Sequence, residues 1–151
     1  PLFCQASGVK ILDEVLQAFN EVKTRHTSRY LLLGLMNSDR EIGVLKKAPL
    51  TAPYEEFLAD LKAYQDQGRG VYGVYDIEYE LESKQKRNKL VFVSWGPDNL
   101  PIRQRMLIAS SKNDLRRKLQ GVHKEMQASE LGEITEDCMI EVCRQGDLGS
   151  N

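Results

Sequence analysis

The chain has 151 residues, of which 41% are hydrophobic and 28% charged, and its 21 Lys and Arg nearly balance its 22 Asp and Glu. This length fits one ordinary globular domain, and the lack of any apolar run near 18 residues argues against a membrane-spanning helix. The net charge of −1 argues against a nucleic-acid-binding protein, which normally carries an overall basic excess. Any basic site must therefore be local.

The three cysteines, Cys4, Cys138 and Cys143, are an odd number and include no C-x-x-C pair. Cys138 and Cys143 are five residues apart, a spacing that points them in different directions on a helix. We therefore expect reduced thiols and a soluble protein of the cytoplasm.

The first half of the chain predicts a helix, a hairpin and a second helix. Apolar residues recur every three or four positions over residues 9–23, which predicts an amphipathic helix. The short apolar segments 29–36 and 41–47 flank a turn and predict a hairpin. Pro53 then begins a second helix over residues 53–64.

Two further strands, over residues 71–82 and 89–95, are separated by a polar turn. The first of them alternates between apolar and acidic residues. We expect its acidic residues on the solvent face: Asp76, Glu78, Glu80 and Glu82.

A long helix over residues 101–119 follows Pro101, and its apolar stripe changes phase. We expect Ile102 and Met106 on its apolar face, but Leu115 lies roughly 100° or more from Ile102 on an ideal wheel. A bend near Ser110 and Ser111 would reconcile the two halves, because serine side chains can hydrogen-bond back into a helix.

A short strand over residues 123–129 and a helix over residues 135–146 complete the layout. Helices alternate with hairpins along the chain. This order predicts a mixed α/β (α+β) fold in which helices cover both faces of a mixed sheet.

Motifs of catalysis and cofactor binding are absent or misplaced. The segment GRGVYG (68–73) matches G-x-G-x-x-G, but a strand is predicted after it, whereas a dinucleotide site needs a helix there. His26 and His123 lack neighbours at metal-binding or catalytic spacing. We therefore expect no enzyme activity, no metal and no cofactor.

Basic residues gather in two segments. Residues 101–119 contain six basic residues and one acid, Asp114, and Arg105, Lys112 and Arg116 lie within about 40° on a continuous helix. The turn before the fourth predicted strand holds the second group: Lys84, Lys86, Arg87 and Lys89. Such groups are either solvated surface or a binding site for an acidic partner, and the second group also matches a nuclear-import patch.

The segment KLVFVSWGPDNLPIRQRMLIASSKNDLRRKLQG (89–121) resembles the signature region of the actin-depolymerising factor (ADF) and cofilin family. In that family a W-x-P-D turn leads into P-V-[KR]-x-[KR]-M and then A-S-S-K. The likeness extends through ASGV, LQAFNEVK and VYDIEYE to the last helix. It implies one ADF-homology domain over residues 7–146, built on a five-stranded sheet, with flexible extensions at 1–6 and 147–151.

The resemblance also implies a function without catalysis. Members bind actin monomers and filaments, prefer ADP-actin, change filament twist and promote severing and subunit loss. The implied surface for both monomer and filament comprises Ser7, Gly8, Arg103, Arg105, Met106, Lys112 and Arg116. The implied filament-only surface comprises Arg87, Lys89 and Glu141.

The resemblance further implies a monomeric protein of the actin cytoskeleton, with phosphorylation at Ser7 and phosphoinositide binding by the basic surface. The last helix departs from the family pattern. Val142 and Gln145 follow Glu141 where strongly severing members carry basic residues. This difference leaves two alternatives open, an adaptor of the coactosin or glia-maturation-factor type and a monomer-binding factor with weak severing.

Overall fold

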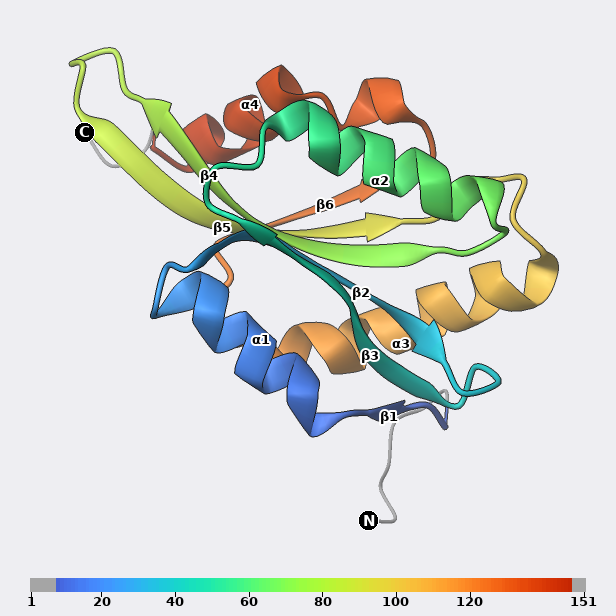
Figure 1. Ribbon diagram of the computed structural model, residues 1–151. Coiled ribbons are helices and arrows are strands. Elements are labelled where there is room, and N and C mark those ends of the chain that lie inside the picture. The colour runs from blue at the N-terminus through green and yellow to red at the C-terminus, as the bar shows by residue number, and fades with distance from the viewer. Residues whose placement is uncertain (1–7, 148–151) are drawn as a thin grey trace.

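The computed structural model describes residues 8–147, which form one six-stranded mixed sheet between two pairs of helices (Figure 1). The strands are β1 (Lys10–Ile11), β2 (Ser28–Met36), β3 (Glu41–Pro49), β4 (Val71–Glu80), β5 (Lys86–Trp95) and β6 (Lys124–Ala128). The helices are α1 (Asp13–Lys23), α2 (Tyr54–Asp66), α3 (Ile102–Lys118) and α4 (Glu136–Asp147), with a 3-10 turn, η1 (Leu131–Glu133), before α4. The predicted fold class is confirmed.

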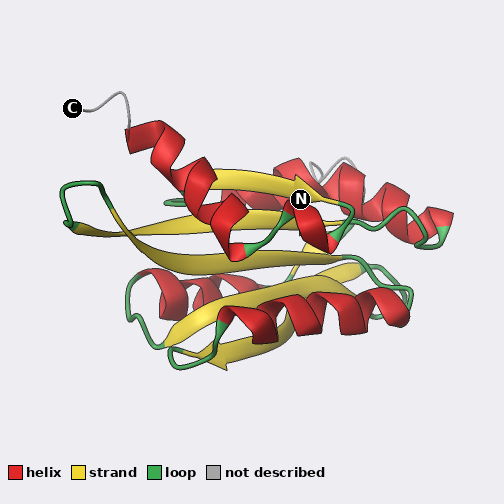
Figure 2. Ribbon diagram, turned by 90° about the horizontal axis from the view of Figure 1, so that it is seen from above, coloured by secondary structure: helices red, strands yellow, loops and turns green. Residues whose placement is uncertain are grey.

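The sheet has the order β1-β3-β2-β4-β5-β6. Its central strands pair antiparallel, whereas β1 and β6 pair parallel to β3 and β5 at the two edges. Figure 2 shows the helices lying on both sides of the sheet.

Each face of the sheet has its own hydrophobic core because side chains alternate along the strands. Leu31 and Leu33 of β2 pack with α1 and α3, whereas Tyr30 and Leu32 pack with α2 and α4. Trp95 is buried at the end of β5, and its indole N–H donates to the Leu61 carbonyl of α2 at 3.0 Å. Both layers are therefore held to the same central strands.

The sequence prediction missed the edge strand β1, so the sheet has six strands and not five. The Lys10 and Leu12 amides donate to the Arg40 and Ile42 carbonyls, which keeps the chain extended where a helix was predicted. α1 begins only at Asp13, where Asp13 and Glu14 place negative charge at the positive end of the helix dipole.

The prediction that all four acidic residues around β4 face solvent is wrong for Asp76, which is buried. The Asn88 side chain donates to Asp76 Oδ1 at 3.3 Å, and His26 Nδ1 lies 3.8 Å from Asp76 Oδ2. A buried carboxylate needs such partners, and these come from other segments.

Residues 68–70 form a turn into β4, which begins at Val71, so the segment 68–73 lacks the helix that a dinucleotide site needs. Gly68 has a φ of +73°, and a Cβ at Gly70 would lie 2.7 Å from Ile108 of α3. The glycines therefore permit the turn and the approach of α3.

Candidate functional site

The N-terminal half of α3 exposes a large apolar surface. Ile102 and Met106 are 67% and 64% exposed, so the predicted apolar face of this half of the helix points to solvent and not to the core. The buried face is formed by Ile108, Ser111 and Leu115, at helical spacing. α3 is one uninterrupted helix, and the change of phase marks the point where its apolar residues turn from solvent to the core.

Tyr72 holds the middle of α3 on the sheet. Its buried hydroxyl donates to the Ile108 carbonyl at 2.5 Å. Burial raises the pKa of Tyr72 well above its usual value, so the hydroxyl remains a donor at physiological pH. The exposed N-terminal half of α3 is therefore anchored to the sheet at Ile108.

Two arginines flank the exposed apolar pair, and they differ in their partners. Arg103 Nε lies 3.3 Å from Asp39 Oδ2, at the turn between β2 and β3. Arg105 is exposed and forms no ion pair or side-chain hydrogen bond with any residue of the described part of the chain. Solvent-exposed apolar side chains beside cations are typical of a binding surface for an acidic partner.

A shallow hollow of about 490 Å³ lies between α3 and the segment that links β6 to η1. Arg105 and Lys112 both line it, and Lys112 donates to the Gln127 side chain at 3.3 Å. Glu133 lies at the same hollow. The backbone N–H groups of Ser129 and Glu130 lower the pKa of Glu133, so it remains ionised.

Arg116 belongs to the fold rather than to this hollow. Its side chain is 29% exposed, its Nε lies 3.3 Å from Glu125 Oε2, and its Nη2 donates to the Val122 carbonyl at 3.3 Å. The predicted stripe of three cations is thus divided, since only Arg105 and Lys112 share the hollow.

Of the two predicted site residues with the lowest numbers, the structure describes Gly8 but not Ser7. Gly8 is exposed, with a φ of +76°, and precedes the buried Val9, which lies just before β1. Ser7 lies outside the described residues. Sequence reasoning overlooked Asp39 and the exposed Ile102, although an apolar residue in a first turn that also carries arginines was a usable signal.

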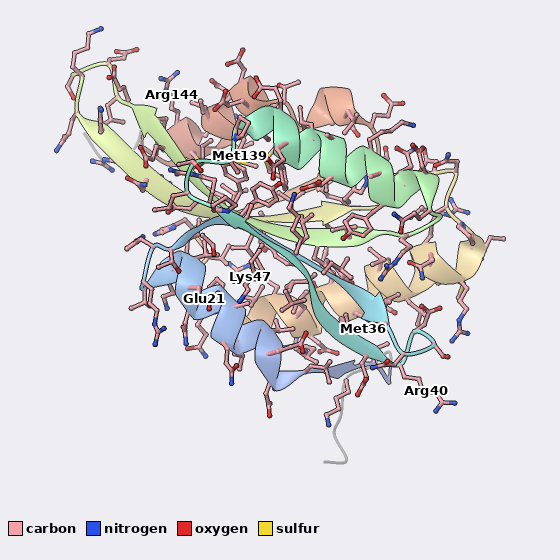
Figure 3. All side chains as sticks on the ribbon, viewed as in Figure 1. Glu21, Met36, Arg40, Lys47, Met139 and Arg144 are labelled. Carbon is pink, nitrogen blue, oxygen red and sulfur yellow. The ribbon has the colours of Figure 1, made fainter. Side chains whose placement is uncertain are left out.

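The second predicted surface lies where α4 meets the long hairpin of β4 and β5. Lys89 Nζ donates to the Cys143 carbonyl at 3.0 Å. Arg144 donates to the Glu80 carbonyl at 2.7 Å, and Figure 3 shows it between α4 and the hairpin. These contacts join the end of α4 to the hairpin.

The other predicted residues of this second surface lie nearby. Arg87 is half-buried in β5 opposite Tyr79 of β4, whereas Glu141 of α4 is exposed. Val142 is half-buried and Gln145 is exposed. Of these two departures from the family pattern, Gln145 is therefore the more exposed to solvent.

Residues 8–147 contain no group of three His, Cys, Asp or Glu side chains placed to hold a metal ion. No helix among these residues is long and apolar enough to cross a lipid bilayer. The groups gathered on the exposed half of α3 are cations and apolar side chains.

Comparison with known proteins identifies the family. Residues 8–144 match the model of the cofilin/tropomyosin-type actin-binding proteins. Cofilin of Saccharomyces cerevisiae is 38% identical over 93% of this chain and 95% of its own length, and actophorin of Acanthamoeba castellanii is 34% identical over 89% and 94%. The structure of Streptomyces griseoflavus cofilin superposes with a TM-score of 0.79 at 35% identity, covering 89% of this chain and 96% of that one. The chain therefore belongs to the actin-depolymerising factor and cofilin family.

Proposed function

We propose that this chain binds actin monomers and filaments, prefers the ADP form, changes filament twist and promotes severing and subunit loss. The observation that carries the proposal is the exposed pair Ile102 and Met106, which share the first turns of α3 with Arg103 and Arg105. Met106 offers a flexible apolar contact, while the arginines set the encounter rate and register on an acidic partner.

The work of disassembly comes from differential binding and not from a chemical step. A ligand that binds one filament geometry more tightly shifts the filament population toward that geometry. α3 would supply the contact common to monomer and filament. Arg87, Glu141 and the hairpin that Lys89 joins to α4 would supply the second contact, which exists only in a filament.

Imaging of single fluorescent ADP-actin filaments tests this proposal. We expect frequent breaks with the wild-type chain and none with Arg103→Ala/Arg105→Ala. The matched control Arg25→Ala/Lys62→Ala removes two positive charges, one from the loop after α1 and one from α2, and it should sever normally. Equal loss in both double variants would show that total charge and not this surface drives severing.

An alternative is a monomer-binding factor, or an adaptor of the coactosin type, with weak severing. Gln145 favours it, since this exposed position lacks the positive charge expected of strong severing. A coactosin from Entamoeba histolytica shares the fold with a TM-score of 0.74 at 20% identity. Intact filaments in the imaging assay, with normal monomer binding by nucleotide exchange, would support this alternative.

Two forms of regulation accompany the proposal. Phosphorylation at Ser7 would add negative charge near the start of the domain and oppose docking on acidic actin. Phosphoinositides would compete with actin for Arg105 and Lys112. Ser7→Glu should weaken monomer binding relative to Ser7→Ala. Vesicles containing phosphoinositides should release actin monomers from the wild-type chain, whereas neutral vesicles should not.

Family membership associates the protein with the actin cytoskeleton, consistent with the cytoplasm. We further propose that it acts as a monomer and also enters the nucleus through the basic group Lys84, Lys86, Arg87 and Lys89. Sedimentation equilibrium tests the first point. Loss of nuclear signal from a tagged chain after substitution of the four residues tests the second.

A further inference from the structure

The first turn of α3 lacks the side chains that usually stabilise a helix N-terminus. Pro101 at the N-cap makes no side-chain hydrogen bond, and the turn contains no acidic residue. It carries Arg103 and Arg105, although cations are unfavourable at the positive end of the helix dipole. By contrast, α1, α2 and α4 each have two acidic residues in the first turn.

A residue distant in sequence supplies the missing negative charge. Asp39, whose side chain is 26% exposed, lies 3.3 Å from Arg103 Nε through Oδ2 and accepts a hydrogen bond from Gln104 Nε2 at 3.1 Å through Oδ1. Gln104 Oε1 in turn accepts from the Gly70 amide at 3.2 Å. One carboxylate therefore holds two successive residues of the α3 first turn.

The turn that carries Asp39 has an unusual backbone. Asn37, Ser38 and Asp39 have φ values of 54°, 61° and 62°, a left-handed conformation that residues with a Cβ seldom adopt. The Arg40 amide closes the turn by donating to the Asn37 carbonyl at 3.3 Å, and Figure 3 shows Met36 and Arg40 beside it. This backbone directs the Asp39 carboxylate at α3.

We propose that Asp39 is a positioning residue for actin binding: it replaces the missing N-terminal acid of α3 and fixes the orientation of Arg103. The inference rests on the proposed function. Simple charge complementarity predicts the opposite effect, since removal of an acid beside a cationic surface should strengthen docking on an acidic partner. The sign of the change in affinity therefore decides between positioning and shielding.

Three variants separate the contributions of Asp39. Asp39→Asn removes the charge and keeps an acceptor for Gln104, whereas Asp39→Ala removes both. Glu41→Gln is the matched control, because it makes the same charge change on the same hairpin and keeps an acceptor for the Asn37 side chain. In a monomer nucleotide-exchange assay we expect affinity to fall about two- to fivefold in Asp39→Asn, as for other helix-terminus charges. The loss should be greater in Asp39→Ala and negligible in Glu41→Gln.

Two further readouts distinguish positioning from a general loss of stability. In an Arg103→Gln background, Asp39→Asn should cause a smaller loss of affinity than in the wild-type background, because the contribution through Arg103 is already gone. Hydrogen exchange of the Arg105 and Met106 amides in the chain without actin should accelerate in Asp39→Asn and stay unchanged in Glu41→Gln.

Tighter actin binding by Asp39→Asn, or unchanged exchange at the start of α3, would overturn the inference. A wild-type chain that fails to bind actin would overturn the proposed function instead. The exchange measurement would still report whether Asp39 orders α3, because it needs no actin.

Discussion

The N-terminal half of α3 and the contact between α4 and the β4–β5 hairpin differ in the partners of their cations. On α3, Arg105 is exposed without a side-chain partner in the described chain, beside the exposed Met106. At α4, Lys89 and Arg144 donate to backbone carbonyls of neighbouring elements at 3.0 and 2.7 Å. The first group is available to a partner, whereas the second already stabilises the fold.

This difference teaches that a basic residue in a binding segment need not be a binding residue. The resemblance assigned both Arg105 and Lys89 to actin contacts. The structure gives Lys89 a second role, since its ammonium group binds the carbonyl end of α4, where a positive charge is favourable. Loss of Lys89 should therefore affect stability and filament binding together, while loss of Arg105 should affect binding alone.

The largest effect should come from Arg105→Ala/Met106→Ala. We expect monomer affinity to fall at least about tenfold, because apolar and arginine side chains at the centre of an interface carry most of its binding energy. The free energy of unfolding should change by no more than about 0.5 kcal/mol, since both side chains are exposed. Nucleotide exchange on monomers and urea unfolding measure the two quantities, and a marked loss of stability would contradict the comparison.

Lys89→Met should be intermediate. Removing the charged donor leaves the Cys143 carbonyl without that hydrogen bond and should cost about 1–2 kcal/mol of stability. Filament co-sedimentation should weaken, while monomer binding stays normal. Lys86→Met, an exposed position on the same strand, is the control. Unchanged stability in Lys89→Met would mean that Lys89 does not stabilise the fold and acts only through contact with the filament.

The sequence predicted the order of the elements because each long helix and strand carries its own periodicity. It missed β1 since a two-residue strand has no period, and its apolar residues also fit the helix that follows. Asp76 was assigned to solvent by strand alternation, yet partners from other segments, including Asn88 and His26, make its burial possible.

The site was predicted in part for a similar reason. The charge pattern indicated a binding surface in segment 101–119, but periodicity grouped Ile102 and Met106 on one apolar face without showing whether that face is buried or exposed. Apolar residues are normally assigned to the core of their own chain. The local sequence does not distinguish them from apolar residues that stay exposed and bind another protein. The contacts of Asp39 and Lys89 also require knowledge of which segments meet in space.

A smaller effect should separate Arg116 from Arg105 on the same helix. Arg116→Gln removes the hydrogen bond to the Val122 carbonyl and the ion pair with Glu125, and should cost roughly 1 kcal/mol of stability. Arg105→Gln should cost none. Urea unfolding of the two variants tests this directly. Equal stabilities would mean that the contacts of Arg116 are as weak as an average surface pair.

The smallest effect concerns the pH dependence of stability that arises from His123. His123 Nδ1 accepts a hydrogen bond from the Leu90 amide at 2.9 Å, so the folded chain favours the neutral ring. Partial burial and the nearby Lys89 charge lower the pKa of His123 below its usual value. Between the folded and unfolded pKa values the unfolded chain binds more protons, so His123 lowers the free energy of unfolding as pH falls below about 6.5.

His123→Gln should remove this part of the pH dependence, because glutamine does not titrate. Urea midpoints of both chains between pH 7.5 and about 5.5 measure the difference. The wild-type midpoint should fall more steeply than that of the variant as the pH is lowered. Parallel curves would mean that the pKa of His123 is the same in the folded and unfolded chains. Burial, the Leu90 hydrogen bond and the Lys89 charge would then have no net effect on its protonation.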